Sequence, residues 1–198
     1  MAEDRRTRRT RRALRDALVA LILERGYAGL TVEDISERAD VARATFYSHY
    51  RDKDHLFTRI TTDLLQELDE RMQPLVEETA VGFTGKPLLE LFRHAEQQRD
   101  LYLAILRGEG DGKALRTFSE ESVHRVAAVF RDRAEHGPVR PRLPADLLAR
   151  AWVGEQLAVL HWWLEHETPP MPAEEAARML LDLAVHGRFW ASGFTAPS

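Results

Sequence analysis

The sequence predicts an all-α protein of about nine helices, with a small N-terminal helical unit and a larger C-terminal helical domain. Three observations predict this fold class. Apolar residues recur with the helical period along most of the chain. No segment alternates apolar and polar residues as a half-buried strand does. Near the N-terminus, two short helical segments joined by a tight turn follow a longer one, an order typical of a three-helix helix-turn-helix unit.

The composition limits the classes of protein to which the chain can belong. It has 198 residues, of which 44% are hydrophobic and 30% charged, enough for a sizeable globular core. It has no cysteine, which excludes disulfides, thiol catalysis and thiolate metal sites. We find no apolar run long enough to span a bilayer and no signal-peptide pattern. These features predict a cytoplasmic protein without a membrane partner.

The net charge of -4 is unevenly distributed along the chain. Residues 1–60 contain 13 Lys and Arg against 10 Asp and Glu, a net charge of +3, and the remainder contains 15 against 22, a net charge of -7. Residues 1–15 alone carry seven arginines and two acids. A basic arm on an otherwise acidic chain favours local contact with a polyanion, and the alternative is a solvated tail.

The first two helices follow from apolar spacing and from their end signals. Leu14 and Leu18 share one face of a first helix, and Gly26 is a favourable residue for its C-terminal end. Thr31, with Asp34 three residues later, predicts a variant of the capping box at the start of a second helix.

The remaining helices are separated by short turns and by segments rich in Gly or Pro. A brief third helix is expected before a long fourth helix that is strained or kinked near Pro74. The predicted ranges are 42–47, 54–81, 88–106, 115–135, 145–166 and 172–190.

The third helix is expected to have a buried face and a chemically active one. Val41 and Phe46 point inward and anchor it. Arginine can bond bidentately to a guanine edge, threonine can meet a thymine methyl, and Tyr, Ser and His can donate to phosphates. Lys53 begins the next helix, whose free backbone amides also favour an anion. The side chains on the outer face are Arg43, Thr45, Tyr47, Ser48 and His49.

The stretch "GYAGLTVEDISERADVARATFYSHYRDKDHLF" resembles the DNA-binding domain of the TetR family of bacterial transcriptional regulators. The likeness covers about residues 8–60 and includes Gly-aromatic after the first helix, Thr-Val at the start of the second and Thr-Phe-Tyr in the third. It implies that residues 1–53 form a basic arm and helix-turn-helix DNA-binding domain. Residues 54–198 would form a helical regulatory and dimerisation domain.

The resemblance also implies roles for individual residues. Base edges would be contacted by Arg43, Thr45 and Ser48. Phosphates would be contacted by Thr31, Tyr47, His49, Lys53 and, from the arm, Arg8, Arg9 and Arg12. The chain departs from the family pattern at Ala42, where many members have Ser or Thr, and at Ala44, where many have Gly. We expect Asp40 to replace the missing hydroxyl as the cap of the third helix.

The C-terminal helices favour a homodimer. The segment "DLLARAWVGEQLAVLHWWLEH" is hydrophobic around much of its circumference, and the small residues Ala176, Ala177, Ala184 and Gly187 would let another helix approach closely. Two such helices and their symmetry mates would form a four-helix interface. The alternative is an intramolecular core.

The resemblance further implies a small-molecule effector in the C-terminal domain. Apolar and aromatic side chains with a polar group among them would suit a small hydrophobic or aromatic effector, and the alternative for each is ordinary packing. Segments such as "LHWWLEH" also resemble a C-terminal subgroup of the family in which some members act with a protein partner. The candidates for the pocket are Phe92, Tyr102, Leu106, Phe130, Trp152 and Gln156.

The sequence contains no arrangement typical of an enzyme. "GEGDGK" lacks the spacing of a phosphate loop, and His161 and His166 are one residue too far apart for the zinc helix motif. We therefore expect no catalytic residue, metal or cofactor. The hypothesis is a homodimeric, sequence-specific DNA-binding regulator, a ligand-responsive repressor on a palindromic operator.

Two alternatives remain open. The first is a regulator that is controlled by a protein partner or acts as an activator. The second is a small-molecule binding protein or enzyme that keeps the N-terminal unit as a scaffold. The basic arm and Lys53 argue against the second, because we expect neither to be required for folding.

Overall fold

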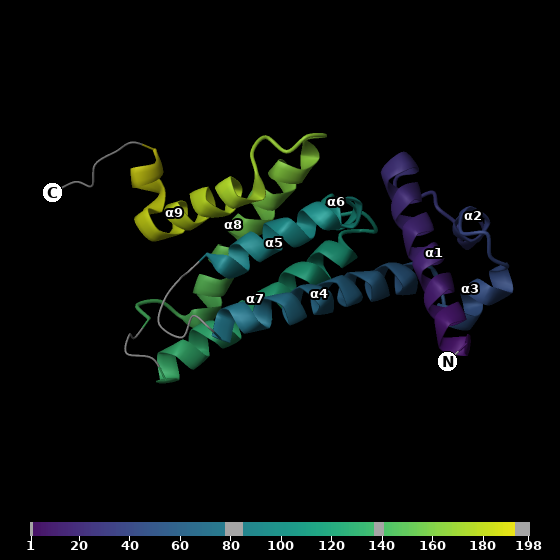
Figure 1. Cartoon of the computed structure of the whole chain (residues 1–198), viewed down its shortest axis with the longest axis horizontal. Coiled ribbons are helices and arrows are strands. Elements are labelled where there is room, and N and C mark those ends of the chain that lie inside the picture. The colour runs from purple at the N-terminus through teal and green to yellow at the C-terminus, as the bar shows by residue number, and fades with distance from the viewer. Residues whose placement is uncertain (1, 78–84, 137–140, 193–198) are drawn as a thin grey trace. The chain divides into compact units, whose positions relative to one another are not determined.

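The computed structural model describes residues 2–77, 85–136 and 141–192. Within these ranges the chain forms nine α-helices and no strand (Figure 1). The fold class that the sequence predicts, all-α, is therefore confirmed. The helices are α1 (Ala2–Arg25), α2 (Val32–Arg38), α3 (Arg43–His49), α4 (Lys53–Glu77), α5 (Lys86–Gln97), α6 (Arg99–Leu106), α7 (Lys113–His136), α8 (Ala145–Glu165) and α9 (Ala173–Ala191).

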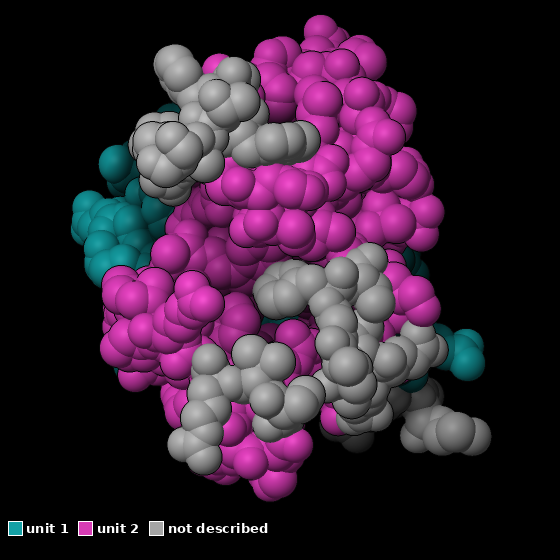
Figure 2. All heavy atoms as spheres, turned by 90° about the vertical axis from the view of Figure 1, so that its left-hand side faces the viewer, with its two compact units in different colours: residues 1–65, 100–118 teal, residues 66–99, 119–198 magenta. Residues whose placement is uncertain are grey.

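The chain divides into two compact units, which Figure 2 shows in different colours. Unit 1 contains residues 1–65 and 100–118, and unit 2 contains residues 66–99 and 119–198. The division falls within α4 and again within α7, so both helices contribute to both units. The segment 100–118 thus groups with the helix-turn-helix region, although it lies far along the chain. The functional boundary at residues 53 and 54 remains a prediction.

The core of unit 1 is formed by the inward faces of its helices. The second helix packs against α1 and α3. Leu14 and Leu18 of α1, Ile35 of α2, Phe46 of α3 and Leu56 of α4 are all completely buried. Burial of these apolar side chains is the main favourable contribution to folding. In the short helix α3, the buried Phe46 side chain holds the helix against this core.

Unit 2 is built around α5, α8 and α9, which contact one another pairwise (Figure 1). Phe92 of α5 and Trp163 of α8 are fully buried, and their rings meet edge to face with centroids 5.3 Å apart. The Trp163 indole N–H donates to the Met171 carbonyl at 2.8 Å. Arg99 donates to the Leu164 carbonyl at 2.8 Å, near the end of α8, where helical carbonyls lack intrahelical partners.

The predicted single helix over residues 88–106 is wrong. It is two helices, α5 and α6, separated at Gln98, which has φ -115° and ψ 29°. Neither Gly nor Pro marks the break. Every residue from Leu101 to Leu106 is buried, so this part of α6 has no polar face. The sequence therefore shows no shift in helical periodicity that would mark the start of a new helix.

The small residues of α9 do not all serve the role that the sequence predicts for them. Ala176 and Ala177 are buried within the chain, at 3% and 4% exposure, so they pack inside unit 2. Ala184 is exposed. Gly187 has φ +83° and kinks α9, a left-handed conformation that favours glycine. Ala176 and Ala177 are therefore not available to a second chain, and the surface of α9 that could contact one is smaller than predicted.

A completely buried histidine, His94, lies on α5 beside polar residues of α4. Its Nε2 atom is 3.6 Å from Glu67 Oε1. Arg71 donates to Glu67 at 2.7 Å and to Gln97 at 2.9 Å. Burial lowers the pKa of His94 below its ordinary value of 6.5, and the nearby Glu67 carboxylate opposes part of that change.

We expect stability to fall as the pH falls below about 6.5. In that range the unfolded chain binds a proton at His94 that the folded chain does not bind, because the folded-state pKa is lower. Above that pH the histidine is neutral in both states and contributes no slope. In His94→Gln, the midpoint of thermal unfolding should change less with pH between about pH 5 and 6.5 than it does in the wild type. His124→Gln, at an exposed position of α7, is the control; equal slopes in both variants would contradict the assignment.

Candidate nucleic-acid interface

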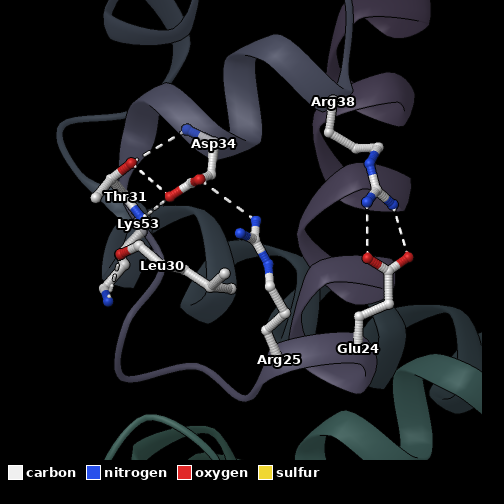
Figure 3. A network of polar contacts seen from close by, with 7 residues as sticks. All are labelled: Glu24, Arg25, Leu30, Thr31, Asp34, Arg38 and Lys53. Carbon is white, nitrogen blue, oxygen red and sulfur yellow. Dashed lines mark hydrogen bonds and ion pairs between the residues drawn. The ribbon is translucent and has the colours of Figure 1, made fainter.

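The second helix begins at a capping box, as the sequence predicts. The Asp34 backbone N–H donates to the Thr31 hydroxyl at 3.1 Å, and the Thr31 backbone N–H donates to the Asp34 carboxylate at 2.8 Å. The Thr31 hydroxyl, which donates to the Asp34 carboxylate at 2.6 Å, and then the Thr31 backbone N–H lower the pKa of Asp34 below its ordinary value. Arg25 also donates to Asp34, at 3.3 Å, which ties the end of α1 to the start of α2 (Figure 3). The orientation of α2 is thus fixed by side chains as well as by its core face.

A second tie joins the same two helices. Arg38 donates to both carboxylate oxygens of Glu24, at 2.8 and 2.7 Å (Figure 3). A bidentate pair of this kind restricts orientation more than a single contact does. Both side chains are exposed, so the pair contributes little to the free energy of unfolding. Its role is to fix the orientation of α2 relative to α1.

The third helix has the two faces that the sequence predicts. Phe46 is completely buried, whereas Tyr47 is 52% exposed and their rings meet edge to face. Arg43 and Ser48 are exposed, and Thr45 is half-buried. The Ser48 hydroxyl donates to the Thr45 carbonyl at 2.7 Å, which leaves its oxygen lone pairs available as acceptors.

The cap of the third helix differs from the prediction. Ala42 is its N-cap and supplies no side-chain bond. Asp40, expected to replace it, instead adopts a left-handed backbone with φ +52° in the turn between the helices. Asn and Asp tolerate this conformation better than other residues with a Cβ atom. The predicted capping role of Asp40 is wrong, and the first amides of α3 carry no side-chain cap.

The start of α4 is capped by Asp52, for which no role was predicted from the sequence. The Asp52 carboxylate accepts from the His55 backbone N–H at 2.7 Å and from Arg51 at 2.9 Å. His55 Nδ1 in turn accepts from the Arg51 backbone N–H at 3.2 Å. The signal was present, because an acid three residues before the capped amide is the usual N-terminal pattern. His49, predicted to contact phosphate, lies half-buried just before this turn.

Lys53 holds the turn between α1 and α2. Its ammonium donates to the carbonyls of Tyr27, Ala28 and Leu30, at 3.0, 3.2 and 2.8 Å (Figure 3 shows the Leu30 contact). It also lies 4.4 Å from the centroid of the Tyr27 ring. An ammonium has three N–H donors, and these carbonyls match that number. Lys53 therefore makes structural contacts that the sequence did not predict, and its predicted phosphate contact remains a prediction.

We expect Lys53→Met to lower the free energy of unfolding by on the order of 2 kcal/mol, because three carbonyls lose a charged donor. The midpoint of thermal unfolding, followed by circular dichroism, measures this loss. Lys113→Met, at an exposed lysine that begins α7, is the control. A variant with an unchanged midpoint and weakened DNA binding would show that the side chain acts on phosphate alone.

Tyr27 joins the glycine-rich segment 107–113 to the helix-turn-helix region, within unit 1. The Tyr27 backbone N–H donates to Glu109 Oε2 at 2.9 Å. Gly110 faces the Tyr27 ring so closely that an added Cβ atom would lie 3.1 Å from it. The phenol donates to Asp54, and the ring stacks on Phe57. Burial, then the bond to Asp54, raises the pKa of this phenol. No sequence pattern pointed to this contact.

The basic arm is helical where the structure describes it. Arg8, Arg9 and Arg12 lie on α1, which is continuous from residue 2, and their side chains are exposed. Arg12 lies 3.7 Å from Asp16 one turn later, an exposed pair of little weight. The helix presents these guanidinium groups along one solvent-facing surface, as contact with a polyanion requires.

The candidate pocket residues are divided between the two units. Phe92 is buried against Trp163 in unit 2, and Tyr102 meets Phe118 edge to face in unit 1. Leu106 is also buried in unit 1. Phe130 packs on a small apolar cluster of unit 2, while Trp152 and Gln156 are half-buried on α8 in the same unit. Phe92, Tyr102, Leu106 and Phe130 therefore have packing roles, and the joint role of all six residues in ligand binding remains a prediction.

The described parts of the chain contain neither a cluster of metal-ligating side chains nor a bilayer-spanning helix. No group of three or more His, Asp or Glu side chains there is arranged to hold a metal ion. None of the helices there combines the length and the hydrophobicity of a bilayer-spanning segment.

The chain is similar to known proteins over its N-terminal region. The family model described as bacterial regulatory proteins, tetR family, matches residues 14–60. The uncharacterized HTH-type transcriptional regulator YxbF of Bacillus subtilis is 46% identical over 54 residues, which are 27% of this chain and 14% of that protein. The chain thus matches a small part of that relative's length.

Other similarities extend over most of the chain. The HTH-type transcriptional repressor DhaR of Mycobacterium sp. (strain GP1) is 24% identical over 174 residues, covering 76% of this chain and 81% of that protein. The crystal structure of a TetR transcriptional regulator from Streptococcus agalactiae superimposes with a TM-score of 0.66 at 26% identity, covering 95% and 99% of the two chains. FadR of Bacillus subtilis, solved with stearoyl-CoA, gives a TM-score of 0.71 at 19% identity, covering 89% and 98%.

The helix-turn-helix geometry, the family match and the full-length structural similarity agree with one another. Residues 14–60 match the tetR family of bacterial regulatory proteins, and the chain is similar in structure to a TetR transcriptional regulator over nearly the full length of both chains.

Proposed function

We propose that the chain is a cytoplasmic, homodimeric regulator of transcription that binds a palindromic operator. The observation that carries this proposal is the exposed face of α3. It presents Arg43 and Tyr47 to solvent, while the buried Phe46 holds the helix in place. An exposed arginine and phenol on a short rigid helix are suited to base edges and phosphates in a major groove.

An exposed apolar stripe on α8 supports the homodimer. Its members follow one another at intervals of three or four residues, so they lie on one helical face. Leu147 and Trp162, at its two ends, are 52% and 45% exposed. On α9, Met179 and Val185 are 50% and 62% exposed. The stripe consists of Leu147, Ala151, Gly154, Ala158 and Trp162.

Small residues in the middle of the stripe would let a symmetry-related α8 approach closely, and the large apolar residues at its ends would be covered. The two-fold axis of such a dimer would relate two recognition helices to two half-sites.

We further propose that the regulator is a repressor responsive to a small hydrophobic effector. Two related proteins support this: DhaR is a repressor by name, and FadR was solved with stearoyl-CoA. The Glu109–Tyr27 bond supports a route for the response, since it joins the segment after α6 to the turn that orients α2. A ligand that moved this segment would alter the helix-turn-helix region through that bond.

The proposal is tested by selecting duplexes from a random-sequence DNA library with the full-length protein. We expect enrichment of an inverted repeat whose half-sites are about one helical turn apart, roughly 10 base pairs. A library that stays random after repeated rounds would contradict the DNA-binding function. Enrichment of a single half-site without a repeat would contradict the dimer but not the reading of DNA.

A further inference from the structure

An acidic side chain lies on the DNA-facing surface beside the arginine assigned to base reading. Arg43 Nη1 is 3.6 Å from Glu33 Oε2, and the two side chains are 57% and 61% exposed. Glu33 belongs to the first turn of α2 and Arg43 to the first turn of α3, so the contact joins the two helices of the motif. Tyr47, one turn along α3, and then Glu33 raise the pKa of the Arg43 guanidinium.

Four other acids of this region have contacts that support the fold. Asp34 closes the capping box, Asp52 caps α4, Asp54 accepts from the Tyr27 phenol and Glu24 pairs with Arg38. Glu33 is not part of the capping box, which Thr31 and Asp34 complete. Its ion pair is exposed, and exposed pairs contribute little to stability.

A carboxylate on this surface also opposes DNA binding, since it faces the phosphates of any duplex. An arginine fork has five N–H donors, and a flexible one can pair with any phosphate, which carries no sequence information. Paired with Glu33 on one side, the guanidinium has fewer orientations and keeps donors for a planar base edge. The carboxylate then weakens complexes with DNA in which Arg43 does not contact a guanine.

We propose that Glu33 is a specificity-determining residue that positions Arg43 for base reading and weakens binding to unrelated DNA. This inference rests on the proposed function. It assigns Glu33 an indirect role, through Arg43, and gives α2 a part in specificity in addition to its support of α3.

The test compares Glu33→Gln with the wild-type protein on two probes, a duplex selected by the wild type and a scrambled duplex of equal length. We expect affinity for the scrambled duplex to rise and the ratio of selected to scrambled affinity to fall at least about fivefold, part of the discrimination that one arginine–guanine pair provides. Glu37→Gln, one turn along α2, removes the same charge and should leave the ratio unchanged.

A double-mutant cycle with Arg43→Ala separates positioning from other roles. If Glu33 acts through Arg43, then Glu33→Gln should relax the same base position as Arg43→Ala and should have no further effect on the ratio in that background. Additive effects at two different base positions would overturn the proposal, because Glu33 would then read a base directly.

Two other outcomes would also overturn it. One is an unchanged ratio of selected to scrambled affinity together with a lowered thermal midpoint. Glu33 would then only stabilise α2, as an acidic residue in the first turn of a helix does. The other is an equal rise in affinity for both probes, which is the effect of charge alone. Failure of the wild type to select any duplex would instead count against the proposed function.

Discussion

Gly154→Arg is expected to convert the dimer to a monomer and to weaken binding to the two-half-site operator by roughly 10²- to 10⁴-fold, the usual gain from linking two binding modules. Gly154 lies in the middle of the exposed stripe of α8. A Cβ atom added there meets no other atom within 4 Å, so the folded chain has room for the side chain. Arginine is also a better helix former than glycine, by up to about 1 kcal/mol. The loss is thus expected in assembly and not in folding.

Sedimentation of the variant gives its oligomeric state, and anisotropy with the selected duplex gives its affinity. Ala128→Arg is the matched control, because it places the same side chain at an exposed small residue of a different helix, α7. A Gly154→Arg protein that remained dimeric would show that α8 does not form the interface. A monomer with full operator affinity would show that the operator is read by one subunit.

Arg43→Ala is expected to weaken binding to the selected duplex by about 1–3 kcal/mol per half-site and to relax one base position. The side chain is exposed and its ion-pair partner, Glu33, is on the surface, so its removal leaves no buried group unsatisfied. The thermal midpoint should therefore stay within a few degrees of the wild type, about the shift that a small stability change produces. Repeating the selection with the variant measures the relaxed position.

Arg51→Ala serves as the comparison, since Arg51 is an exposed arginine whose side chain pairs with the neighbouring Asp52. It removes the same charge close to α3 without altering the face assigned to base reading. A uniform loss across all base positions in Arg43→Ala would show that Arg43 contacts phosphate. The division between base-reading and phosphate-binding residues would then be reversed for this position.

Much of unit 1 could be predicted from the sequence because its signals are local. The capping box of Thr31 and Asp34 depends on two residues three apart, and Gly26 ends α1 with φ +75° as a C-terminal glycine does. Phe46 is the one large apolar residue inside a short polar helix, so its burial followed from composition alone.

The features that could not be predicted depend on residues far apart in the chain. The bond from Tyr27 to Glu109 spans 82 positions, and the pattern around Glu109 reads as an ordinary glycine-rich linker. The break at Gln98 falls in the polar stretch 96–100, and the residues that follow it, Leu101 to Leu106, are all buried, so their periodicity does not show that a new helix has begun. The resemblance to the TetR family implied only a phosphate contact for Lys53. Its bonds to three carbonyls could not be predicted, because these carbonyls lie 23 to 26 positions away in the chain.

The central claim is that a basic helical arm and the exposed face of α3 bind DNA together. The measurement that tests it most directly is the dissociation constant for the selected duplex, determined between about 50 and 200 mM salt. Arg8, Arg9 and Arg12, with or without Lys53, would supply about 6–8 phosphate contacts per dimer, so affinity should fall by roughly 10³- to 10⁵-fold over that range. A dissociation constant that stayed constant with salt, or that was the same for a scrambled duplex, would contradict the claim.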